Sequence, residues 1–122
     1  MADRKQYLSR PTENGQILIS EDVIATIAYH ALTDIEGYVG LTAKTNAEFP
    51  VALNHKNWSK GIRITVTDKG NLIVELNILV LYGFEVMNIA AAIQNAVSTA
   101  VSSVTGITPR RVHVNICGVI RK

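Results

Sequence analysis

The chain has 122 residues, of which 48% are hydrophobic and 18% are charged, and its formal net charge at pH 7 is +2. This size and apolar content suit one globular domain with a single core. The basic residues are scattered along the chain, which gives little support to a phosphate-binding surface. The single cysteine, Cys117, excludes an internal disulfide and suits a reducing compartment.

Residues 1–14 are charged and lack the apolar segment of a secretory signal, so we predict a flexible tail there and a single domain over residues 15–122. The uncharged stretch 86–109 approaches the length of a membrane span, but its many polar side chains favour a soluble helix. These features predict a cytoplasmic protein that does not itself insert into a membrane.

The first half of the domain predicts a strand, a helix and a second strand. Residues 16–19 read as a short strand, and Ser20 then offers an N-cap hydroxyl before an amphipathic helix. Gly37 is predicted to end that helix, and residues 39–44 to form the next strand. Residues 45–60 show no sustained period and are predicted to form a long loop.

The second half predicts a hairpin, a long helix and a last strand. Apolar residues alternate with polar ones over 62–67 and 72–80, on either side of a turn with Gly70. A helical period follows from about residue 84, with Val104 on its apolar stripe and Gly106 as C-cap. After Pro109 the alternation returns. Each helix and the sheet carry apolar side chains on one face only, and these faces can be buried against each other. This pattern predicts a two-layer α+β sandwich of order β-α-β-β-β-α-β, with both helices on one face of a mainly antiparallel sheet.

Three segments carry a resemblance to a known family, namely GQILISEDVIATIAYHALTDIEGYVGL, KGIRITVTDKGNLIVELNILVLYG and IAAAIQNAVSTAVSSVTGITPRRVHVNICGV. Their order and spacing resemble the alkaline shock protein family, the envelope stress response family of Gram-positive bacteria. The resemblance implies a small, cytoplasmic, non-enzymatic protein that supports envelope homeostasis. Some members of that family are tethered to the membrane by a partner, so the resemblance also implies a protein partner that can recruit the chain to the membrane.

Gly37 and Gly40 form a G-x-x-G, which in KH domains joins two helices and clamps a nucleic-acid backbone. Here a strand is predicted after the second glycine, and Glu36 precedes the first. We therefore interpret the G-x-x-G as a structural turn. A nucleic-acid-binding module and a small ligand-binding protein remain the alternative functions.

The sequence offers no catalytic constellation. Signatures for P-loops, dinucleotide sites, zinc proteases and acyl transfer are missing, and the histidines lack partners at metal-ligand spacing. His113 and Cys117 would lie ~13 Å apart on an extended strand. We therefore expect no enzymatic activity, no cofactor and no metal.

The polar face of the predicted sheet is the main candidate for binding a protein partner. An exposed sheet face without function is the alternative. Trp58, in the long loop, is a further anchor candidate, with packing onto the core as its alternative. The candidate partner-binding residues are Arg63, Glu75, Asn77, Leu79, Arg111, His113, Asn115 and Trp58.

The outward side of the second helix is small, polar and uncharged from Val86 through Pro109. A freely solvated helix usually carries charges, so this side predicts contact with another copy of the chain. A solvated helix stabilised by its alanines is the alternative. The candidate self-association residues are Ala92, Asn95, Ala96, Thr99 and Ser102.

Overall fold

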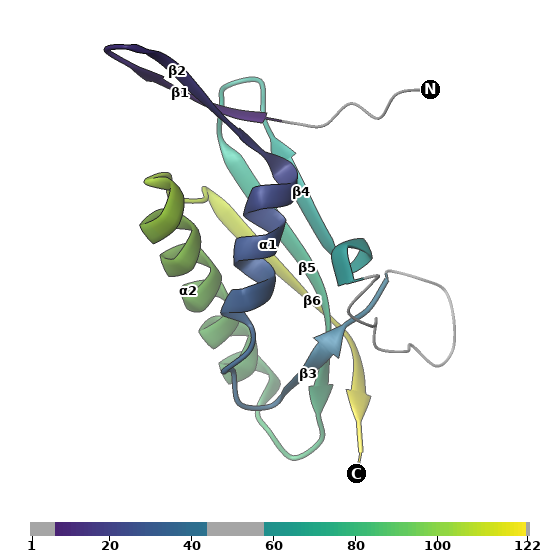
Figure 1. The fold of residues 1–122 in the computed structure, drawn as a ribbon. Coiled ribbons are helices and arrows are strands. Elements are labelled where there is room, and N and C mark those ends of the chain that lie inside the picture. The colour runs from purple at the N-terminus through teal and green to yellow at the C-terminus, as the bar shows by residue number, and fades with distance from the viewer. Residues whose placement is uncertain (1–6, 44–57, 122) are drawn as a thin grey trace.

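The protein is described by a computed structural model over residues 7–43 and 58–121. Two helices lie side by side on one face of a four-stranded sheet, and a two-stranded hairpin extends from one end (Figure 1). From β2 onward the predicted order and the two-layer α+β fold are confirmed. The elements are β1 (Tyr7–Thr12), β2 (Gly15–Ser20), α1 (Glu21–Ala31), β3 (Tyr38–Leu41), the 3-10 helix η1 (Trp58–Gly61), β4 (Ile62–Val66), β5 (Leu72–Leu81), α2 (Val86–Thr105) and β6 (Arg111–Ile120).

Strand β5 is the centre of the larger sheet. Strand β6 pairs with it in parallel, from Ile73 opposite Arg111 to Leu81 opposite Ile120. On its other edge β4 and β3 pair antiparallel with successive segments of β5. The predicted hairpin is β4–β5, closed by the amide of Thr67 donating to the carbonyl of Asn71 at 2.9 Å.

The core lies between the sheet and the helices. Alternate residues of β5 face it because strand side chains alternate, and its even-numbered positions from Leu72 to Val80 are all buried. Each helix contributes one stripe, with Ile24 and Ala28 on α1 and Ile93 and Val97 on α2 fully buried. Val104, predicted on the buried stripe, is instead exposed in the last turn of α2.

The N-terminus differs from the prediction of a flexible tail over residues 1–14, because residues 7–12 form β1, paired with β2. Leu8 is buried in the core, and the Nη1 atom of Arg10 donates to the carbonyl of Gly106 at 2.9 Å. The last turn of α2 contains no basic residue of its own, so Arg10 supplies the positive charge that a helix C-terminus favours. An isolated hairpin is marginally stable, and these tertiary contacts hold β1 in place.

The prediction that Gly37 ends the first helix is wrong. Helix α1 ends at Ala31 with Leu32 as its C-cap, and Gly37 follows five residues later, before β3. Its φ of 86° lies in the left-handed region that favours glycine. A Cβ atom there would lie 2.7 Å from the Cδ1 atom of Ile89 and 3.0 Å from the Cγ atom of Phe84. Gly37 is therefore required by packing against the start of α2.

Candidate functional site: the polar face of the sheet

Strand register brings the predicted polar residues together on the face of the sheet opposite the helices. Arg63 on β4 pairs with Glu75 on β5, which pairs with His113 on β6. Asn77 and Asn115 form the next pair along β5 and β6. Residues that are far apart in the sequence thus form one cluster across three strands.

Asn115 connects this cluster. Its Nδ2 atom donates to the Oε2 atom of Glu75 and to the Oδ1 atom of Asn77, both at 2.9 Å. The Nη1 atom of Arg63 lies 3.9 Å from the Oε1 atom of Glu75, with side chains 77% and 27% exposed. An ion pair this long and exposed adds little stability, whereas the charge-assisted hydrogen bonds to Glu75 fix the central side chains. We call Arg63, Glu75, Asn77 and Asn115 the polar network.

The Sγ atom of Cys117 lies 4.0 Å from the Oδ1 atom of Asn77, on the same face. Sequence reasoning did not predict this contact, because it depends on the parallel register of β5 with β6, in which Asn77 lies opposite Asn115, two residues before Cys117. The register then shifts, because Cys117 is an extra residue of β6 between the pairs Ile78–Ile116 and Leu79–Gly118. Glycine at 118 is the one sequence signal that suggests this irregularity. Within the described residues, no buried side-chain nitrogen or oxygen lacks a hydrogen-bond partner.

Not every predicted partner-binding residue is accessible. Arg111 and His113 are exposed at the rim of the network. Leu79, predicted to project outward, has no exposed surface, which corrects its place in the candidate set. Trp58 does not join the network, because its ring stacks on Tyr29 of α1 with centroids 4.4 Å apart and packs against the core. The rest of the predicted long loop lies mostly outside the described residues.

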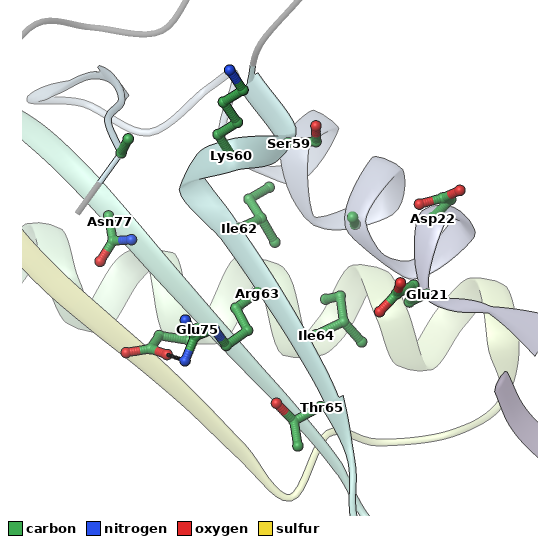
Figure 2. A pocket seen from close by; sticks show the side chains of 12 residues that line it. Glu21, Asp22, Ser59, Lys60, Ile62, Arg63, Ile64, Thr65, Glu75 and Asn77 are labelled. Carbon is green, nitrogen blue, oxygen red and sulfur yellow. Dashed lines mark ion pairs between the residues drawn. The ribbon is translucent and has the colours of Figure 1, made fainter. Parts of the chain in front are cut away.

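A hollow of about 630 Å³ adjoins the polar network (Figure 2). It follows β4, with the first turn of α1 on one side and the β5 side chains Glu75 and Asn77 on the other. Lys60 and Arg63 contribute positive charge, and Glu21, Asp22 and Glu75 contribute negative charge. This mixed lining differs from the mainly apolar pockets that enclose most small ligands.

The side chains of the polar network are held mainly by contacts with one another. Glu75 and Asn77 are hydrogen-bonded within the polar network, and both also line the hollow beside β4. Residues 7–43 and 58–121 contain no group of three or more His, Cys, Asp or Glu side chains that could hold a metal ion. Burial, with a smaller contribution from Tyr29, raises the pKa of Tyr38 from 10.0 to about 12. Tyr38 therefore stays protonated at neutral pH.

The G-x-x-G does not join two helices. Gly37 lies in a turn, and Gly40 lies within β3, opposite Leu79 of β5. This arrangement lacks the helix pair that presents a KH loop to nucleic acid.

The predicted self-association residues lie on α2 as expected from the helical period. Ala92, Asn95 and Thr99 are exposed, while Ala96 and Ser102 are partly buried. The Oγ atom of Ser102 lies 3.2 Å from the Oγ1 atom of Thr108, so this side chain helps to hold the turn after the helix.

Comparison with known proteins places this fold in a family. A model of the alkaline shock protein 23 family, described by a cell envelope-related function, matches residues 9–121. An uncharacterized protein of Streptococcus pyogenes, Spy1614, is 32% identical over 107 residues, covering 86% of this chain and 88% of that protein. The uncharacterized protein YloU of Bacillus subtilis is 32% identical over 111 residues, covering 88% and 91%.

A second uncharacterized Bacillus subtilis protein, YqhY, is 20% identical over 108 residues, covering 88% of this chain and 79% of that protein. No solved structure gives a significant match. Neither α1 nor α2 has the combination of length and apolar character that a membrane crossing requires. The family match over nearly the whole chain, with relatives in Gram-positive bacteria, shows that the chain belongs to the alkaline shock protein family, whose function is related to the cell envelope.

Proposed function

We propose that the protein is a non-catalytic interaction protein of the cell-envelope stress response, which binds a protein partner through the polar face of its sheet. The observation that carries this proposal is the polar network, in which Asn115 joins Glu75 to Asn77 across two strands. Side chains held before binding lose little conformational freedom on contact. The network therefore provides a preorganised centre, and the exposed side chains of Arg63, Arg111 and His113 surround it.

The composition of this surface supports a protein partner. Arginine is enriched at protein interfaces and is among the residues whose truncation costs most binding energy. Two exposed arginines beside a partly exposed carboxylate suit a partner surface that is polar and carries acidic groups. The envelope-related function of the family favours a partner anchored in the membrane, to which this protein would be recruited from the cytoplasm.

The test is affinity capture from a Gram-positive lysate prepared with and without its membranes, using matched variants. We expect Arg63→Ala and Arg111→Ala to reduce recovery of the specific partner by about tenfold or more, because each removes an interface arginine. Lys69→Ala removes the same charge from the exposed β4–β5 turn and should leave recovery unchanged. Equal recovery by all three variants would show that the polar face is not the binding surface.

A nucleic-acid function makes the opposite prediction and is tested separately. We expect no binding of single-stranded RNA at ~0.15 M salt, because the basic side chains are scattered and phosphate contacts weaken steeply with salt. Sub-micromolar affinity in a fluorescence titration would reverse the proposal.

The hollow beside β4 supports a second candidate function, the binding of a small polar molecule, because its volume of about 630 Å³ lies in the range of ligand sites. Native mass spectrometry of protein purified from a Gram-positive host distinguishes the two functions. A stoichiometric small molecule that is lost in Arg63→Ala would favour the ligand-binding function, whereas a mass equal to that of the polypeptide favours the partner-binding function.

A further inference from the structure

The turn between β1 and β2 contains an exposed Asn–Gly pair. Asn14 and Gly15 are both exposed, and the hairpin that carries them extends from one end of the molecule (Figure 1). The sequence contains no other asparagine that is followed by glycine. Within residues 7–43 and 58–121, no hydrogen bond or ion pair holds the side chain of Asn14. Its amide group is therefore open to attack by the backbone of the next residue.

The chemistry of such a pair needs only water. The backbone nitrogen of the glycine loses its proton and forms a bond to the Cγ atom of the asparagine, whose side-chain amide leaves as ammonia. This step closes a succinimide ring. Water then adds to one of the two ring carbonyls and opens the ring to aspartate or to isoaspartate. The net reaction consumes one water, releases one ammonia and replaces a neutral amide by a carboxylic acid, which changes the local charge.

Gly15 suits the attacking role. It has no Cβ atom to crowd its nitrogen, and a Cβ built there would meet nothing within 4 Å, so the surrounding space is open. Gly15 pairs with Thr12 at the last position of the hairpin, where the Oγ1 atom of Thr12 donates to the carbonyl of Gly15 at 3.3 Å. Ring closure requires this pair to open, and the tip of a two-stranded hairpin opens more readily than a helix or a central strand.

The other described asparagines lack this combination. Each is followed by a residue that carries a Cβ atom and lies in the regular structure of β5, α2 or β6. Some also have their side chains held, because Asn115 donates to Asn77 at 2.9 Å and Asn88 donates to Glu85 at 3.3 Å. These residues provide an internal reference for the reactivity of Asn14, and they are Asn71, Asn77, Asn88, Asn95 and Asn115.

We propose that Asn14 is a site of spontaneous deamidation, and that the isoaspartate formed there releases β1 from the end of α2. In isoaspartate the main chain passes through the Cβ and Cγ atoms, so the turn gains one backbone atom. The turn of a hairpin sets the register of its strands. Thr12 and Gly15 can then no longer pair in the same geometry, and the misfit is transmitted along β1.

Strand β1 has few contacts that could resist this change. Leu8 is its one buried residue, and the Nη1 atom of Arg10 donates to the carbonyl of Gly106 at 2.9 Å. Arg10 pairs with Ile17 inside the hairpin, so a change of register moves the guanidinium relative to α2. Ordinary aspartate keeps the normal backbone and adds a charge only at an exposed tip. Isoaspartate, and not aspartate, is therefore expected to loosen β1.

Timed incubation of the full chain tests the site. The purified protein is held in mildly alkaline buffer, digested at intervals and followed by mass spectrometry, in which each deamidation adds about 1 Da. We expect Asn14 to react about tenfold faster or more than Asn71 or Asn95, because only its neighbour is an unhindered glycine in a turn that opens readily. Asn14→Gln removes the reactive group and should abolish the mass gain in this peptide. Equal rates at Asn14 and Asn95 would overturn the proposal.

Hydrogen exchange tests the release of β1. The isoaspartate form is isolated by chromatography and identified by its resistance to a protease that cleaves before aspartate. It is compared with incubated Asn14→Gln and with fresh Asn14→Asp, two variants that require no left-handed backbone because Asn14 has no positive φ. We expect the amides of residues 7–12 to exchange about tenfold faster in the isoaspartate form alone. Exchange as slow as in Asn14→Asp would overturn the proposed release. Neither readout depends on the proposed envelope partner.

Discussion

Substitution of Gly37 tests how the turn after α1 is fixed against α2. Gly37 has a φ of 86°, and a Cβ atom there would lie 2.7 Å from the Cδ1 atom of Ile89. Gly70 provides a matched control, because its φ is 80° and a Cβ atom would meet nothing within 4 Å. Both alanine variants incur the left-handed backbone cost, but only Gly37→Ala also overpacks the core.

The backbone cost of a left-handed alanine is about 1–2 kcal/mol, and overpacking of a core adds about 1–3 kcal/mol. We therefore expect Gly70→Ala to lower the free energy of unfolding by about 1–2 kcal/mol and Gly37→Ala by about 2–5 kcal/mol. At roughly 4 °C per kcal/mol for a chain of this size, the respective decreases in Tm are about 4–8 °C and 8–20 °C. Urea and thermal unfolding followed by circular dichroism measure both quantities.

A double-mutant cycle with Ile89→Val identifies the clash directly. This substitution removes the Cδ1 atom that a Cβ at position 37 would approach most closely. The single Ile89→Val variant should cost about 0.5–1.5 kcal/mol, and the double variant should be more stable than additivity predicts by about 1 kcal/mol. Equal losses for Gly37→Ala and Gly70→Ala, together with additivity in the cycle, would refute the packing explanation.

Three further predictions concern other contacts. Arg10→Ala should lower the free energy of unfolding by about 1 kcal/mol, measured by urea unfolding, because the C-terminus of α2 loses the guanidinium that donates to the carbonyl of Gly106. The folded-state pKa of Tyr38 is raised to about 12, so the unfolded chain loses this proton first as the pH rises, and wild-type stability should fall between about pH 10 and 12. The free energy of unfolding of Tyr38→Phe should fall by about 1 kcal/mol less over this pH range, a magnitude that allows for the partial exposure of Tyr38. Parallel curves of unfolding free energy against pH for the two proteins would contradict the assignment of this pKa to Tyr38. Asn115→Leu should cost about 1–3 kcal/mol in thermal unfolding, because Asn77 and Glu75 lose a shared donor, and a neutral result would show that water replaces the amide without loss.

The elements with strong hydrophobic periodicity could be predicted from the sequence alone. The alternation over 62–67 and 72–80 predicted β4 and β5, and the helical period that ends at Gly106 predicted α2, because a one-sided apolar pattern can be buried in only one regular conformation. The same patterns predicted the layer arrangement and the side of the sheet on which Glu75 and Asn115 lie. Motif order and spacing were sufficient to identify the family.

Tertiary structure decided the features that depend on contacts between distant residues. Residues 7–12 have little pattern of their own, and β1 forms because Leu8 reaches the core and Arg10 reaches the end of α2. The need for glycine at position 37 comes from Ile89, more than fifty positions away, and the preceding helix had already ended. The polar network likewise depends on register, which places Asn115 beside Asn77 and Glu75 only after β6 pairs in parallel with β5. Sequence patterns record which side of an element is buried, whereas strand register and close approach are set by the whole packed core.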